Sequence, residues 1–173
     1  MSQAPRALIV IDVQNDYFEG GKFPLWNTAE TLSRIVAAIG RANAQGMPVI
    51  LVQHLSAGGA QAPMFGAGTT GAQIHAQVLA AAPQAPIVSK AYADSFHETT
   101  LDATLQQLGV EELLVCGMMT QNCVTHTAIS RAADAYRVAI ISDCCTTVSP
   151  EIHAFALRAV ATRLPLVEAA AAL

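Results

Sequence analysis

The chain is poor in charged residues, which make up only 13% of its 173 residues. Its nine lysines and arginines are scattered singly, and the formal net charge is -4. Proteins that bind nucleic acid use a basic stripe or patch to neutralise phosphates. The composition therefore argues against a nucleic-acid partner.

A long apolar run is also missing, although 53% of the residues are hydrophobic. No stretch approaches the roughly 18 apolar residues of a membrane span, and residues 1–6 lead into a strand pattern without the features of a signal peptide. We therefore expect a cytoplasmic protein with no membrane partner. At this length we expect one domain, over residues 1–173. Because so apolar a chain needs cover for its surface, we also expect a homo-oligomer, a dimer or a tetramer.

Cysteine and histidine are few, and their spacing matches neither a disulfide framework nor a metal motif. The four cysteines fall near the ends of predicted strands, and we interpret them as thiols. Adjacent Cys144 and Cys145 are badly placed to bridge each other. None of the histidines has a partner at zinc-motif spacing, so we expect no metal and no cofactor. The five histidines are His54, His75, His97, His126 and His153.

Short apolar runs alternate with segments of helical spacing along the whole chain. Residues 6–11 are a near-continuous apolar run, which is typical of a strand buried on both faces of a parallel sheet. This alternation indicates an α/β fold, a three-layer α/β/α sandwich around a mostly parallel six-stranded sheet, for which we expect the order 3-2-1-4-5-6. The predicted strands are 6–11, 49–52, 87–88, 113–116, 137–141 and 164–167, and the predicted helices are 28–45, 74–82, 99–108, 124–136 and 150–162.

Several polar side chains stand at or just after the carboxyl ends of these strands. In an open parallel sheet, ligands bind at that edge, where the strand order reverses. With the expected order, Asp12 and Cys123 would face each other across the crevice, whereas Lys90 would have to reach further. The residues in question are Asp12, Gln53, Lys90, Cys123 and Asp143.

The position of Cys123 favours a reactive thiol, because the residue lies where a predicted strand ends and a predicted helix begins. The positive end of a helix dipole favours an anion, so we expect the thiol to lose its proton more easily than a free thiol. Thr120 is a candidate N-cap of that helix. His126, one turn further on, is an alternative base for a Cys-His pair, although it should point away from the crevice.

The glycine-rich segment 66–71 fits the pattern G-x-G-x-x-G of dinucleotide sites. In that fingerprint the glycines come directly off a strand, whereas here a long loop intervenes. We therefore interpret residues 56–70 as a loop, and possible lid, over the same edge of the sheet.

Three motifs follow one another in the chain. The first, Ala7 to Phe18, contains Asp12 and Gln14 in the pattern D-x-Q-x-x-F; the second is Ser89-Lys90 followed by Ser95-Phe96. The third, Gly117 to Val124, has the pattern G-x-x-T-x-x-C-V. This ordered set resembles the cysteine hydrolases of the isochorismatase-like superfamily, which includes the nicotinamidases.

The resemblance implies a catalytic triad of Asp12, Lys90 and Cys123. It also implies a cis peptide between Met118 and Met119, and an oxyanion hole made by the backbone N–H groups of Met119 and Cys123. In the chemistry that follows, Asp12 accepts the thiol proton, Lys90 holds the charges, and a thioester forms on Cys123 and is hydrolysed.

Departures from the family pattern narrow the range of expected substrates. Nicotinamidases carry an Asp-x-His metal motif after the second strand, where this chain reads Val52-Gln53-His54-Leu55, so we expect neither nicotinamide nor a metal. Isochorismatases often lack the nucleophilic cysteine, so Cys123 favours hydrolysis of a carbon–nitrogen bond. Expected substrate contacts are the rings of Phe18, Trp26, Tyr92 and Phe96 and the amides of Gln14, Gln53 and Asn122.

The sequence therefore predicts a cysteine amidohydrolase that acts on a small amide. Two alternatives stay open: a vinyl-ether hydrolase of the isochorismatase type, and a binding protein that has kept the fold without catalysis.

Overall fold

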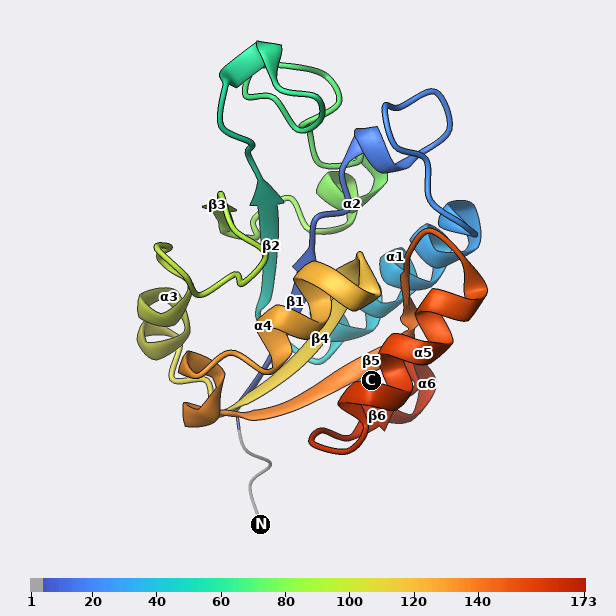
Figure 1. The fold of residues 1–173 in the computed structure, drawn as a ribbon. Helices are drawn as coiled ribbons and strands as arrows, with labels where there is room; N and C mark the ends of the chain where they lie inside the picture. Colours follow the sequence, from blue (N-terminus) through green and yellow to red (C-terminus); the bar gives the residue numbers. More distant parts are fainter. Residues whose placement is uncertain (1–4) are drawn as a thin grey trace.

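A six-stranded parallel sheet forms the centre of the molecule (Figure 1). The computed structural model describes residues 5–173. Its strand order is β3-β2-β1-β4-β5-β6, which confirms the predicted α/β fold and the predicted order. The strands are β1 (Arg6–Ile11), β2 (Val49–His54), β3 (Ile87–Lys90), β4 (Glu112–Met118), β5 (Arg137–Thr146) and β6 (Leu166–Val167).

The position of each strand in the sheet follows from its side chains. All residues of β1 from Ala7 to Ile11 are buried, as expected for a central strand covered on both faces. In β3, at the edge, Val88 is buried and Ile87 is 49% exposed. A continuous apolar run thus forms the centre of the sheet, and an alternating run forms its edge.

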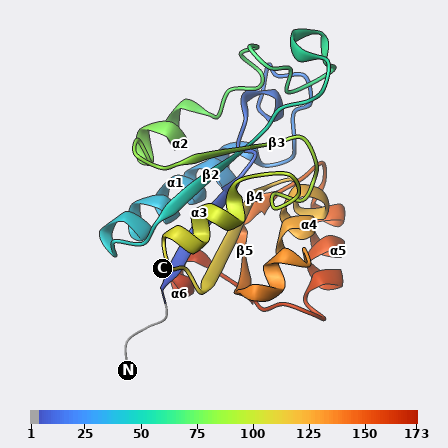
Figure 2. The same ribbon diagram turned by 90° about the vertical axis from the view of Figure 1, so that its left-hand side faces the viewer.

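Helices cover both faces of the sheet. Figure 2 shows α1 and α2 on one side and α4 and α5 on the other. In α1, Leu32, Ile35 and Ile39 are buried at helical spacing. The helices are α1 (Thr28–Ala44), α2 (Ala76–Ala81), α3 (Leu101–Gln107), α4 (Thr125–Ala128), α5 (Pro150–Val160) and α6 (Ala169–Ala172), and short 3-10 turns lie at Asn15–Tyr17, Gly59–Gln61 and Ala132–Ala135.

The predicted helix 124–136 is wrong, because this segment is broken into several turns. A π-helical turn over Thr120–Val124 leads into α4, which ends at Ala128. Beyond it, the Ser130 hydroxyl accepts from the N–H of Ala132 and donates to Asp94. Serine side chains that bond to nearby backbone compete with the helical ladder in this way.

Strand β5 is longer than predicted, which moves Asp143 away from the edge of the sheet. The strand continues to Thr146, so Asp143 lies within it. Its carboxylate accepts from the N–H of Ala169 at 2.9 Å, at the start of α6. The expectation that Asp143 joins the site is therefore wrong, and its contact anchors α6.

Gly117 allows β4 to approach β1 closely at the end of the sheet that carries the site. Its φ is +122°, and a Cβ atom at this position would lie 2.1 Å from the carbonyl oxygen of Ile11. Only glycine fits there. The backbones that carry Asp12 and the turn of Cys123 are held together for this reason.

Among residues 5–173, no helix combines the length and the apolar composition needed to cross a membrane. Residues 1–4, on which the expectation of a missing signal peptide partly rests, lie outside the described residues.

Candidate active site

The three predicted catalytic residues come from three different elements. Asp12 directly follows β1 and has a φ of 51°. Lys90 is the last residue of β3, and Cys123 lies in the π-helical turn Thr120–Val124 after β4. All three residues lie at or just beyond the carboxyl ends of strands, where ligands bind in an open parallel sheet.

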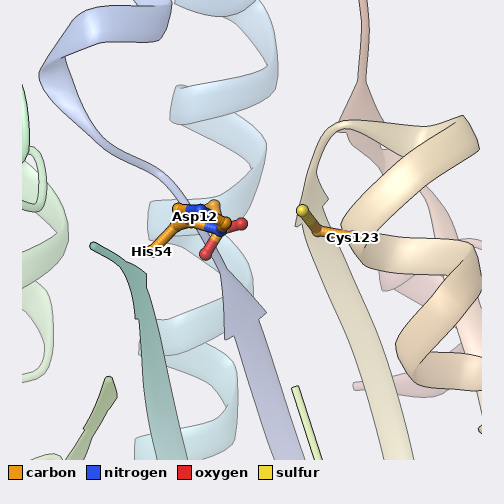
Figure 3. A group of neighbouring side chains, drawn as sticks. All are labelled: Asp12, His54 and Cys123. Atoms are coloured by element: carbon orange, nitrogen blue, oxygen red, sulfur yellow. The ribbon is translucent and has the colours of Figure 1, made fainter. Parts of the chain in front are cut away.

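The side chains of these residues meet. The Nζ atom of Lys90 lies 2.8 Å from Oδ2 of Asp12 and 3.3 Å from Sγ of Cys123. Asp12 is 0% exposed, Cys123 2% and Lys90 3%. Figure 3 shows the sulfur of Cys123 pointing from its turn toward Asp12 and His54. A carboxylate, an ammonium and a thiol therefore share one closed space.

Lys90 reaches this space from two strands away. β3 pairs with β2, and β2 separates it from β1. Lys90 is in register with His54, and its side chain contacts that residue and reaches Asp12. The length of the lysine side chain makes the triad possible across the intervening strand.

The carboxylate of Asp12 is neutralised by the charge of Lys90, and its oxygens remain free to accept a proton. Among the described residues, neither carboxylate oxygen has a hydrogen bond of good geometry, although Lys90 is in ion-pair contact with it. A buried carboxylate without aligned donors is unusual. The sulfur of Cys123 lies within 4.8 Å of one of these oxygens.

The thiol of Cys123 does not have the lowered pKa that the sequence suggested. Burial, together with the charge of Asp12, raises its pKa to about 12, although the charge of Lys90 acts in the opposite direction. The helix after it has only four residues, so little dipole is available to offset burial. The resting nucleophile is therefore a neutral thiol, and it needs a base.

Thr120 is not the N-cap predicted for this segment. Its hydroxyl pairs with Nδ1 of His153 at 2.9 Å, which ties the turn of Cys123 to α5. A second tie comes from the Ser-Phe motif after β3: the N–H of Ser95 donates to Oγ1 of Thr127, and the two hydroxyls are 2.7 Å apart. Both contacts fix the position of the segment that carries Cys123.

The peptide between Met118 and Met119 is cis. Met119 stands directly before the turn of Cys123, and its carbonyl accepts from the N–H groups of Asn122 and Val124. The proposed oxyanion donors, Met119 and Cys123, thus flank one tight turn of backbone.

The predicted polar contacts are largely engaged with the protein's own backbone. Gln14 is fully buried; its amide donates to the carbonyls of His54 and Ala72 and accepts from the N–H of His54. Gln53 also donates to the carbonyl of Ala72. These two side chains join the ends of β1 and β2. Asn122 lies half-buried directly before Cys123.

The predicted aromatic contacts are spread around the site. Tyr92 is joined to the triad through its carbonyl, which accepts from Lys90 at 3.0 Å, while its ring packs edge-on against His97. The other three rings pack on neighbours: Phe18 on His75, Trp26 on His153 and Phe96 on Tyr136. None of these ring contacts involves the triad.

Sequence reasoning missed three residues that the fold brings to the site. Nδ1 of His54 lies 3.0 Å from Nζ of Lys90. Tyr17 is buried, and burial followed by the charges of Cys123 and Asp12 raises the pKa of its hydroxyl. Phe65, from the loop after β2, packs against both of these rings. The one available signal was the place of His54 beside Gln53, at the end of a strand.

The residues present do not suit a metal ion. One ligand atom each of Asp12, His54 and Cys123 lie within 4.8 Å of one another. However, the ammonium of Lys90 contacts all three residues, at 2.8 to 3.3 Å. A metal bound to them would sit about 2.0–2.3 Å from each ligand atom and would compete with this cation for the same space.

Two features that could have suggested other chemistry have structural roles. His126 is exposed, and Nδ1 of its ring pairs with the carbonyl of Asn122, so it does not act with Cys123. The glycines of segment 66–71 belong to the loop between β2 and α2, where Gly71 packs on the carboxylate of Asp16. That loop rises above the carboxyl ends of the strands (Figure 1).

One prominent cavity lies away from the triad. It has a volume of about 650 Å³ and is lined by residues such as Pro48, Pro86 and Leu108, next to the amino ends of β2 and β3. It holds none of the predicted site residues.

Comparison with known proteins gives a consistent result. The family model described as isochorismatase domain matches residues 6–171. The chain is 37% identical to the uncharacterized isochorismatase family protein YddQ of Bacillus subtilis, covering 85% of this chain and 81% of that protein. It is 28% identical to the nicotinamidase/pyrazinamidase of Mycobacterium tuberculosis, covering 91% and 95%. The crystal structure of an isochorismatase family protein from Desulfovibrio vulgaris superposes with a TM-score of 0.89 at 26% identity, covering 98% and 96%.

Proposed function

The chain belongs to the isochorismatase family, and from this premise we propose that it is a cysteine hydrolase that cleaves the carbon–nitrogen bond of a small amide. One observation carries the proposal: a buried ammonium, Lys90, contacts both the carboxylate of Asp12 and the sulfur of Cys123. The similarity to a nicotinamidase/pyrazinamidase supports the amide as substrate class.

The first step joins proton transfer to attack. Because the pKa of the Cys123 thiol is raised to about 12, the thiolate forms only as a base takes its proton. Asp12 is that base. The sulfur attacks the amide carbon, and Lys90 stabilises the negative charge as it passes between sulfur and carboxylate.

The tetrahedral intermediate carries its charge on the former carbonyl oxygen. We assign its stabilisation to the N–H groups of Met119 and Cys123, which flank the turn after the cis peptide. One such donor contributes about 3 kcal/mol to transition-state stabilisation.

The intermediate collapses when Asp12 gives its proton to the leaving amine. The carbon–nitrogen bond breaks, and a thioester remains on Cys123. A water molecule then loses a proton to Asp12 and attacks the thioester, and that proton returns to the sulfur as the acid leaves. Asp12 and Cys123 end in their starting states.

We also expect this enzyme to work as a homo-oligomer in the cytoplasm. Large apolar side chains on α5 support the first expectation, since Phe155 is 78% exposed and Ile152 is 41% exposed. Light scattering coupled to size-exclusion chromatography tests it.

The test of the proposed function is ammonia release from a panel of small primary and cyclic amides. Cys123→Ala should abolish turnover, whereas Cys144→Ala, a matched change at another buried cysteine, should keep it. Mass spectrometry of acid-quenched reactions should detect a covalent adduct on Cys123 in the wild type alone.

Two outcomes would contradict the proposal. Cys123→Ala that hydrolyses isochorismate as fast as the wild type would indicate ether hydrolysis. Equal alkylation of all four cysteines by iodoacetamide at neutral pH, unchanged in Asp12→Asn, would remove the evidence for an activated thiol.

A further inference from the structure

The ammonium of Lys90 has more acceptors around it than it has protons. Its Nζ atom lies 2.8 Å from Asp12 Oδ2, 3.0 Å from His54 Nδ1, 3.0 Å from the carbonyl of Tyr92 and 3.3 Å from Cys123 Sγ. An ammonium has three N–H donors and no acceptor. Each of these four atoms must therefore accept from the ammonium, and the thiol sulfur, at the longest distance, is the weakest acceptor among them.

This geometry selects one tautomer of His54. If Nδ1 accepts from Lys90, the ring proton resides on Nε2. Burial and the positive charge of Lys90 lower the pKa of His54, which keeps the ring neutral at physiological pH. The ring therefore presents one fixed N–H donor.

The imidazole that carries this donor is close to the reacting groups, and its residue is only half-buried. A ring nitrogen of His54 lies within 4.8 Å of both a carboxylate oxygen of Asp12 and the sulfur of Cys123. The residue is half-buried, in contrast to the fully buried triad. Among residues 5–173, Lys90 is the only hydrogen-bond partner of its ring. Its backbone is clamped in both directions by Gln14, so the ring is carried by a rigid strand end.

Resting on the proposed function, we propose that His54 is a specificity-determining residue, whose Nε2–H donates a hydrogen bond to a second acceptor atom of the substrate. The substrate class is then a small amide with an ether or carbonyl oxygen as an acceptor near the scissile carbonyl. In a family fold whose donor set here does not suit a metal, a neutral imidazole performs the recognition.

The first experiment reads the tautomer and the contact without turnover. Long-range nitrogen–proton correlation spectra of histidine-labelled Cys123→Ala protein, assigned with an added His54→Gln change, should identify His54 as the neutral Nε2–H form. Methoxyacetamide should shift this signal, and butyramide, in which a methylene replaces the ether oxygen, should shift it less. An Nδ1–H ring, or a signal that neither compound moves, overturns the inference whether or not the protein hydrolyses amides.

The second experiment measures specificity in the active enzyme. The ratio of kcat/KM for methoxyacetamide over butyramide should fall about two- to ten-fold in His54→Leu, which is the range of one neutral hydrogen bond. The loss should appear in KM. His54→Gln, which can accept from Lys90 and still donate, should retain most of the preference, and His97→Leu, at an exposed histidine, should leave it unchanged.

The two hypotheses fail in different ways. Equal loss of kcat for both compounds in His54→Leu, with the ratio preserved, would assign His54 a purely structural role and overturn the inference. Absence of ammonia from every amide, with the His54 signal still shifted by methoxyacetamide, would overturn the proposed function and leave the recognition by His54 supported.

Discussion

The buried ion pair between Asp12 and Lys90 makes a quantitative prediction about stability. Its atoms are 2.8 Å apart, and both side chains are 0% exposed. Lys90→Met keeps most of the side-chain volume and removes the charge. Removing one partner of a buried pair costs about 3–5 kcal/mol, because the other charge is left without compensation. For a domain with a total stability of about 5–15 kcal/mol, this is a severe loss.

The double variant Asp12→Asn/Lys90→Met separates this charge effect from packing. It removes both charges and leaves no uncompensated carboxylate, so it should be more stable than Lys90→Met alone. We expect a coupling energy of up to about 3 kcal/mol between the two sites. Lys22→Met is the matched control, since Lys22 is exposed and should stay within about 0.5 kcal/mol of the wild type.

Urea unfolding followed by circular dichroism provides the measurement, with the slope of the transition checked for each variant. The reasoning is refuted if Lys90→Met is no less stable than Lys22→Met. It is also refuted if the double variant is as unstable as Lys90→Met, because the cost would then come from packing or from the contacts of Lys90 with His54 and Tyr92.

Three further predictions concern the scaffold. Burial raises the pKa of Cys123 and of Cys144 to about 12; because a thiol with a raised folded-state pKa stabilises fully only below its unfolded value of about 8.5, the melting temperature should fall as pH rises from there toward 12, and less steeply in Cys144→Ala. A melting temperature that does not change over this pH range would contradict the raised pKa values of these two thiols. Gln14→Leu removes the acceptor of the His54 N–H, whereas the carbonyl of Ala72 keeps Gln53 as a donor, and it should therefore cost about 1–3 kcal/mol by urea unfolding; Gln107→Leu, on an exposed face, should change little. Gly117→Ala would place a methyl group 2.1 Å from a carbonyl oxygen and should cost about 3 kcal/mol or more, while Gly40→Ala, in open space within α1, should stabilise by up to about 1 kcal/mol; the opposite order would contradict the account of the β1–β4 contact.

Much of the fold was predictable because it depends on local patterns. The buried run Ala7 to Ile11 indicated a central parallel strand, and the alternation of strands and helices indicated the doubly wound sheet that the structure has. The same patterns were weak at boundaries. They did not reveal that β5 continues through Asp143 to Thr146, because that extension follows from pairing with β4 across an irregularity in register.

The candidate site, like the fold, was only partly predictable from the sequence. Asp12 and Cys123 were predictable as neighbours, because adjacent parallel strands end at the same edge. The pKa of Cys123 was predicted in the wrong direction: the position of a thiol before a helix can be read from the chain, but its burial beside a carboxylate cannot.

The sequence by itself determined the succession of strands and helices, the edge at which polar residues gather and the types of group available there, because these follow from hydrophobic periodicity and chain direction. Only the tertiary structure decided that Lys90 reaches across β2, that His54, Tyr17 and Phe65 join the cluster, and that Gln14 serves the backbone. These contacts join residues far apart in the chain, and each depends on the length and rotamer of a side chain in a closed space, a property that no local pattern encodes.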